Sequence, residues 1–104
     1  MIQEIARLVV KPGDEAAFEA GAAQAAALFK GAAGCHAMRL HRSHEVPGRY
    51  WLVIAWDSVE AHLAFRETGD FGEWRRLVGN YFAEPPQVEH GIPTGAGFDP
   101  VRET

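Results

Sequence analysis

Two histidines, His62 and His90, are the residues whose chemistry best suits proton removal near neutral pH. An unperturbed imidazole has a pKa of about 6.5, so either side chain could act as a general base. Arg75 adds a cation that, if it points inward, could stabilise a phenolate or an enolate. Each residue also has a structural interpretation, because either histidine could be exposed and Arg75 could pair with Glu73 or Asp70 on the surface. The sequence therefore predicts three candidate catalytic residues.

Aromatic side chains are frequent in the same part of the chain and could bind a planar ring. The candidates for substrate binding are Trp56, Phe65, Phe71, Trp74 and Tyr81. Large rings of this kind dominate both ligand pockets and ordinary cores, so core packing is the alternative for the first four and an interface anchor for Tyr81. As a set they predict an aromatic-walled cavity for a planar ring.

A metal site is not expected from the residues between positions 35 and 44. Strand alternation would place Cys35 and His41 on one face and His36 and His44 on the other, and no acidic residue lies among them. Cys35 is the only cysteine, so an intrachain disulfide is excluded, which fits a reducing cytoplasm. We therefore predict neither a metal nor another cofactor on these residues.

Composition limits the function classes further. The 104 residues fit one domain, and the net charge of -4 leaves no basic face for nucleic acid. The first residues lack the pattern of a signal peptide, and no apolar stretch is long enough to cross a membrane. These features predict a cytoplasmic protein that binds neither nucleic acid nor membranes.

The elements that must position the candidate residues follow from the hydrophobic pattern and the turn residues. We expect strands at residues 2–10, 35–44, 49–57 and 87–92, a helix at 15–30, and a second helix in two segments, 58–67 and 70–81. The second segment would begin with a capping box at Asp70 and Glu73. Residues 1–92 then form the domain, and residues 93–104 form an extended Gly/Pro-rich tail that we expect to lie across a neighbouring subunit.

This order is the βαββαβ pattern of α+β ferredoxin-like folds, with a four-stranded antiparallel sheet and helices on one face. The third strand is apolar on both faces, because Tyr50, Leu52, Ile54 and Trp56 alternate with Trp51, Val53 and Ala55. The helices can cover only one face. A second copy of the sheet could cover the other, so we expect a homodimer that forms a dimeric α+β barrel.

Several sequence stretches strengthen this interpretation. They are E-I-A-R-L-V-V-K-P-G near the start, L-x-R-S-x-E at 40–45, R-Y-W-L-V-I-A-W-D-S-V-E-A-H at 49–62, F-G-E-W-R at 71–75 and Y-F-A-E-P-P-Q-V-E-H at 81–90. Their order and spacing resemble the antibiotic biosynthesis monooxygenase (ABM) family of small dimeric α+β barrels. The resemblance spans residues 2–91, which leaves only the tail outside it.

The resemblance implies a pocket between the sheet and the helices, where a flat phenolic substrate loses a proton and reacts with oxygen without metal or flavin. A haem-degrading branch of the family uses an Asn, a Trp and a His ligand at positions that correspond here to Ala6, Phe65 and Arg75. Because all three differ, the cofactor-independent monooxygenase is the leading hypothesis. The alternative is a non-catalytic dimer that binds a small ligand or serves as an accessory protein.

Overall fold

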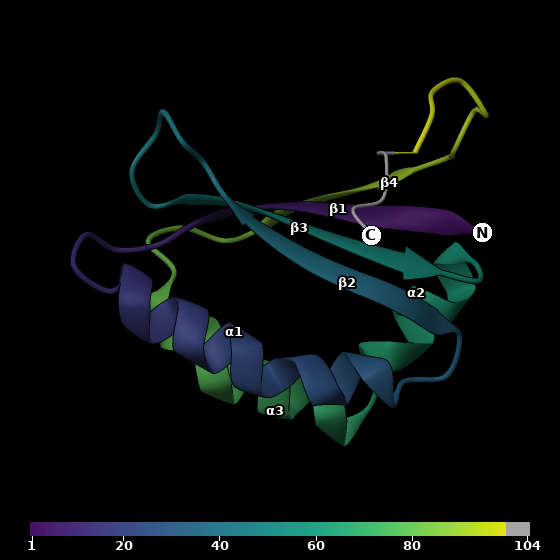
Figure 1. The fold of residues 1–104 in the computed structure, drawn as a ribbon. Helices are drawn as coiled ribbons and strands as arrows, with labels where there is room; N and C mark the ends of the chain where they lie inside the picture. Colours follow the sequence, from purple (N-terminus) through teal and green to yellow (C-terminus); the bar gives the residue numbers. More distant parts are fainter. Residues whose placement is uncertain (100–104) are drawn as a thin grey trace, which may run out of the picture.

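The computed structural model describes residues 1–99 and shows a four-stranded antiparallel sheet with helices packed against one face (Figure 1). The elements in chain order are β1 (Ile2–Val9), α1 (Glu15–Lys30), β2 (Cys35–Arg42), β3 (Arg49–Trp56), α2 (Val59–Phe65), α3 (Gly69–Val78), the 3-10 turn η1 (Gly79–Tyr81) and β4 (Gln87–Gly91). The predicted α+β ferredoxin-like fold is confirmed. Residues 100–104 of the predicted tail lie outside the described residues.

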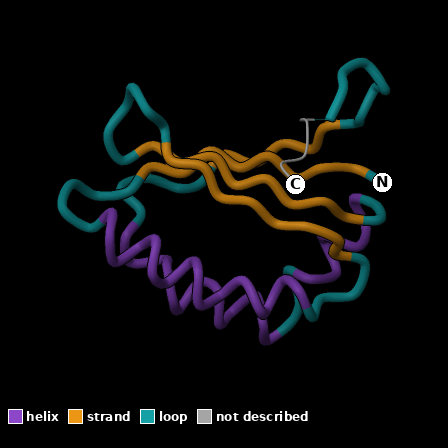
Figure 2. Tube along the Cα trace, viewed as in Figure 1, coloured by secondary structure: helices purple, strands orange, loops and turns teal. Residues whose placement is uncertain are grey.

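The strand order in the sheet is β2-β3-β1-β4, so β1 and β3 are central and β4 is an edge strand (Figure 2). In the antiparallel register Glu4 lies opposite Ile54 on β3 and opposite His90 on β4. Residues paired in this way point to the same face of the sheet. The register therefore brings Glu4 and His90, which are far apart in sequence, side by side on the face that carries the helices.

The core fills the space between that face and the two long helices. On α1 an apolar stripe of Phe18, Ala22, Ala25 and Phe29 is buried, as helical spacing requires. Gly21 lies on the side of α1 that meets α3, and a Cβ atom there would come within 2.8 Å of the carbonyl oxygen of Leu77. This glycine therefore allows the close packing of α1 against α3.

Two local predictions were wrong. Helix α3 begins two residues earlier than expected, because the hydroxyl of Thr68 accepts the backbone N–H of Phe71 and replaces Asp70 as the N-cap. Cys35 and His41 do not share a face, because a register shift between Cys35 and Ala37 reverses the alternation at the start of β2. Cys35 pairs with Trp56 and packs against the core, whereas His41 lies on the opposite face.

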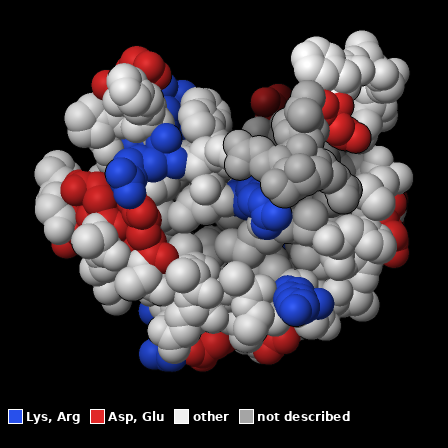
Figure 3. Space-filling model, in the orientation of Figure 1, with Lys and Arg blue, Asp and Glu red and all other residues white. Residues whose placement is uncertain are grey.

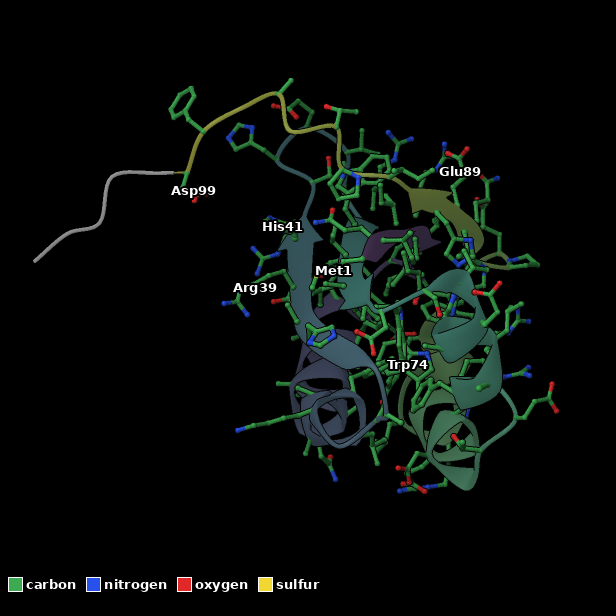
Figure 4. All side chains as sticks on the ribbon, turned by 90° about the vertical axis from the view of Figure 1, so that its right-hand side faces the viewer. Met1, Arg39, His41, Trp74, Glu89 and Asp99 are labelled. Atoms are coloured by element: carbon green, nitrogen blue, oxygen red, sulfur yellow. The ribbon has the colours of Figure 1, made fainter. Side chains whose placement is uncertain are left out.

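The second face of the sheet carries no helix (Figures 1 and 4). Ile5 and Trp51 lie there, each 38% exposed, together with the partly buried Val53. Arg39 and His41 project from β2 into solvent in Figure 4, whereas Trp74 lies below the sheet among the helices. This uncovered face is a mixture of apolar and charged side chains.

The segment after β4 extends away from the domain. Ile92 is 78% exposed and Phe98 is 96% exposed.

On the side drawn in Figure 3, basic side chains are separated from one another by uncharged and acidic ones. Among residues 1–99, no helix has both the length and the hydrophobicity needed to cross a bilayer.

Candidate functional site

A cavity of about 300 Å³ lies between the sheet and the helices. Its lining residues come from β1, β3, α2, α3 and the segment around β4; they are Glu4, Ala6, Leu8, Leu52, His62, Arg66, Phe71, Trp74, Phe82, Pro86 and Val88. Most are apolar or aromatic, and three are ionisable: Glu4, His62 and Arg66. A concave apolar site with a few polar groups is the usual form of a small-molecule pocket.

Glu4 is the carboxylate of this cavity. It follows the alternation of β1 onto the helix face, in line with Ala6 and Leu8, and is only 7% exposed. The indole N–H of Trp56 donates to its Oε1 at 3.0 Å, and Nε2 of His62 lies 3.1 Å from the same oxygen. Within residues 1–99 no hydrogen bond engages Oε2, which leaves this oxygen free for a bound molecule.

His62 is held in place from several sides. It lies on α2, which begins where the Ser58 hydroxyl accepts the backbone N–H of Ala61. Its ring stacks on Trp56 with centroids 5.3 Å apart and an angle of 21° between the planes. Its Nδ1 hydrogen-bonds with Nε2 of His90 at 2.8 Å, and its Nε2 lies 3.1 Å from Oε1 of Glu4, so each ring nitrogen faces one neighbour.

Burial changes the proton affinities of this pair in opposite directions. Desolvation raises the pKa of Glu4, although the Trp56 hydrogen bond and the charge of Arg66 oppose the shift. Desolvation lowers the pKa of His62 to about 4, and electrostatic interactions with His90 and Arg66 add to this effect. Both shifts disfavour an ion pair. A proton taken up by the pair therefore resides on Glu4 while His62 stays neutral.

Arg66 and the aromatic walls complete the site. Arg66 follows α2, and its guanidinium carbon lies 5.9 Å from the centroid of the Phe71 ring. Trp74 is buried by its contacts with Phe29 and the core, and its ring also lines the cavity. The arrangement can bind a planar ring, accept a proton from it and stabilise the resulting anion.

The structure brings only part of the predicted set to this cavity. Phe71 and Trp74 line it, as does His62, and His90 contacts His62 from the sheet edge. Three other predicted residues do not line the cavity. Trp56 is in the core, where it contacts Glu4 and His62, Phe65 is also in the core, and Tyr81 is half-buried in η1.

Arg75 is exposed on α3 and is not among the cavity-lining residues. Its side chain and that of Trp74 lie on different sides of the helix, since adjacent helical residues point about 100° apart. Among residues 1–99, the arginine that lines the cavity is Arg66, which is itself an exposed residue.

Eight of the eleven lining residues were not predicted as site residues, and Glu4, Arg66 and Phe82 are the charged and aromatic members of this group. The position of Glu4 could have been predicted from the sequence, because strand alternation places it on the same inward face as the apolar residues Ala6 and Leu8. Buried carboxylates of this kind are uncommon unless they are paired or functional. Across residues 1–99, no three His, Cys, Asp or Glu side chains are placed to hold a metal ion together.

Comparison with known proteins places this geometry in a family. The family model described as antibiotic biosynthesis monooxygenase matches residues 1–77, which is more than half of the chain. The chain belongs to the antibiotic biosynthesis monooxygenase family. This assignment confirms the resemblance seen in the sequence motifs and supports a monooxygenase-like function in general terms.

Relatives of this ABM chain agree with the assignment. A solved structure from Bordetella bronchiseptica, which carries the provisional name antibiotic biosynthesis monooxygenase, is 57% identical, with a TM-score of 0.88 over 89% of this chain and 96% of that one. A similarly named structure from Caulobacter crescentus CB15 is 29% identical, with a TM-score of 0.77 over 86% of this chain and 85% of that one. The uncharacterized protein YczJ of Bacillus subtilis is 33% identical over 91 residues, which cover 86% of this chain and 96% of YczJ.

Proposed function

We propose that this ABM protein is a cofactor-independent monooxygenase that oxidises a small aromatic, phenolic substrate with O₂. The observation that carries the proposal is the buried Glu4–His62 pair, which forms part of the wall of an otherwise largely apolar cavity. A buried carboxylate with a raised pKa is suited to accept a proton from a weakly acidic phenol or from a neighbouring C–H bond. The cavity volume of about 300 Å³ is at the small end of ligand pockets.

The proposed reaction balances without an added redox group. When a ring CH₂ activated by neighbouring phenols becomes a carbonyl, two C–H bonds break, one oxygen atom of O₂ forms the C=O bond and the other leaves as water. The two protons removed from carbon are the two that water carries away. The electrons pass from the substrate anion to O₂ directly, so the protein has to remove and return protons and stabilise negative charge.

The chain's own residues supply these functions. Oε2 of Glu4 is the proton acceptor, and His62 and Trp56 hold the carboxylate in place through Oε1. Arg66 stabilises the substrate anion at the cavity wall. Phe71 and Trp74 contact the ring and keep water away from it.

We also propose that two copies associate through the uncovered face of the sheet. Ile5, Trp51 and Val53 form an apolar centre there, and a face of this kind on a central pair of strands is normally covered. Arg7 and Arg49 flank it, and their Nε–H groups are buried without a hydrogen-bond acceptor among residues 1–99. A second copy would supply both the apolar cover and acceptors for these groups.

Oxygen uptake tests the proposed activity. Metal-stripped protein is mixed with a panel of phenols and anthrones, and O₂ consumption is followed with an electrode. Glu4→Gln should lower kcat by about 100-fold or more because it removes the proton acceptor while keeping its shape.

Arg66→Gln should reduce kcat/KM about tenfold or more, whereas the matched exposed variant Arg75→Gln should leave it unchanged. If no compound is consumed above its uncatalysed rate, the oxygenase proposal is wrong. Tight binding without turnover would instead support the ligand-binding alternative.

A further inference from the structure

The ionisable groups of the site form a continuous line from the cavity to the surface. Glu4 and His62 are 7% and 5% exposed, whereas His90 is exposed to solvent. Oε1 of Glu4 lies 3.1 Å from Nε2 of His62, and Nδ1 of His62 lies 2.8 Å from Nε2 of His90. Each gap is a normal hydrogen-bond distance, so protons can move along the line without movement of the backbone.

Three elements create this line. The register of β1 and β4 places Glu4 opposite His90, and α2 places His62 above both. Stacking on Trp56 fixes the plane of the His62 ring, and the His62 and His90 rings meet edge to face at 62°. His62 therefore cannot turn to release a proton elsewhere, because each of its nitrogens already faces one neighbour.

We propose that Glu4, His62 and His90 form a proton relay that connects the closed cavity with solvent through His90. The inference rests on the proposed function, since that reaction removes protons from carbon and returns protons to oxygen. In the outward direction, the carboxyl group of protonated Glu4 rotates so that the proton accepted on Oε2 faces Nε2 of His62 and passes to it. The proton on Nδ1 of His62 then moves to Nε2 of His90, and Nδ1–H of His90 is lost to water. Both imidazoles remain neutral and exchange tautomers.

The inward direction reverses each of these transfers and restores the tautomers. One proton leaves when the substrate carbon is deprotonated, and one returns when an oxygen of O₂ is protonated. The relay is therefore reset after each pair of steps, and no electrons move along it. His90 is a positioning residue in this scheme, because it lies outside the cavity lining and acts only through His62.

The test replaces the outer residue of the relay. His90→Gln keeps a hydrogen-bonding group beside Nδ1 of His62 but cannot pass a proton on, so kcat should fall about 10- to 100-fold while KM stays unchanged. In His90→Ala, added imidazole should restore most of the lost rate by taking the place of the missing ring. His44→Ala, which removes another exposed histidine, is the matched control and should behave as wild type.

A second measurement tests the relay without depending on the proposed activity. The ¹⁵N chemical shifts of the His62 ring report which nitrogen carries the proton, and they should change in His90→Gln and in Glu4→Gln but not in His44→Ala. If wild type consumes no O₂ with any phenol, the proposed function fails, and the nitrogen shifts still decide whether the three groups are coupled. If wild type turns over and His90→Gln does so at the same rate, the relay is overturned although the function stands.

Discussion

Glu4 and Ile5 are neighbours on β1 and point to opposite faces of the sheet. The acidic residue is the buried one of the two, and the aliphatic residue is the exposed one. The carboxylate is 7% exposed inside the core, and the isoleucine is 38% exposed on the uncovered face. A folding domain normally places these two residue types the other way round, because burying a charge is costly and burying an aliphatic side chain is favourable.

The two exceptions have different origins. Glu4 is retained inside because Trp56 and His62 satisfy one of its oxygens and the cavity leaves the other free for a ligand. Ile5 is left outside because nothing within residues 1–99 covers that face, together with Trp51. The buried acid therefore supports the proposed chemistry, whereas the exposed aliphatic group on a central strand supports the proposed association of two copies.

The largest difference between the faces should appear in stability, and β3 offers a matched pair of tryptophans for measuring it. Trp56 is fully buried on the helix face and Trp51 is 38% exposed on the other. Trp56→Ala should lower the free energy of unfolding by about 3–5 kcal/mol, because it opens a cavity in the core.

Trp51→Ala should cost less than about 1 kcal/mol when urea unfolding is measured at a low protein concentration. Equal losses for the two variants would show that both faces are buried to the same extent in the single chain. The proposed contrast between the two faces of the sheet would then be wrong.

Much of this architecture could be predicted from the sequence, because alternation and turn residues are local signals. The bounds of α1 at Glu15–Lys30 follow from the turn before it and the glycine after it. The start of α3 could not be decided in the same way, because both Thr68 and Asp70 are good N-caps and only the packing of the helix selects Thr68.

A second prediction concerns the partner of the uncovered face. Ile5→Asp would place two carboxylates near the centre of a symmetric interface, so the dimer dissociation constant should rise about 100-fold, or about 2.8 kcal/mol. Analytical ultracentrifugation over a concentration series measures the change.

Leu63→Asp is the control, because Leu63 is 46% exposed on α2 and lies away from the sheet face. A wild-type protein that stays monomeric at micromolar concentration would contradict the proposed dimer. Equal weakening by both variants would place the interface elsewhere.

The smallest effect is expected from the titration of His62, whose pKa of about 4 lies below the ordinary value of 6.5. Between these two values the unfolded chain binds a proton that the folded chain does not, so stability decreases as pH falls from about 6.5 toward 4. Relative to His62→Gln, wild type should lose about 1–2 kcal/mol between neutral pH and pH ~4.5.

Urea unfolding at several pH values measures this difference. Glu4, whose raised pKa acts in the opposite direction, is present in both proteins, as are His90 and Arg66. If the free energy of unfolding changed with pH in the same way in the two proteins, His62 would bind a proton equally well in the folded and in the unfolded chain.

The site itself was only partly predictable, and the reason is its non-local origin. His62 and His90 could be chosen by residue type, but their contact depends on the β1–β4 register and on where α2 lies over the sheet. Arg66 could not be preferred over Arg75 in the sequence, because the break between α2 and α3 sets which arginine lines the cavity. Sequence patterns indicate which face a residue occupies, and tertiary packing determines which residues on that face meet.

Because β4 is short, it should separate from the sheet at a lower temperature than the rest of the domain unfolds. This five-residue edge strand is almost entirely exposed and pairs only with β1, yet it carries His90. Edge segments with few buried contacts fray at temperatures at which the rest of a domain is intact. Local opening of β4 would detach His90 from His62 while Trp56 and the core remain folded, so the proposed relay would be lost at temperatures below the melting temperature of the domain.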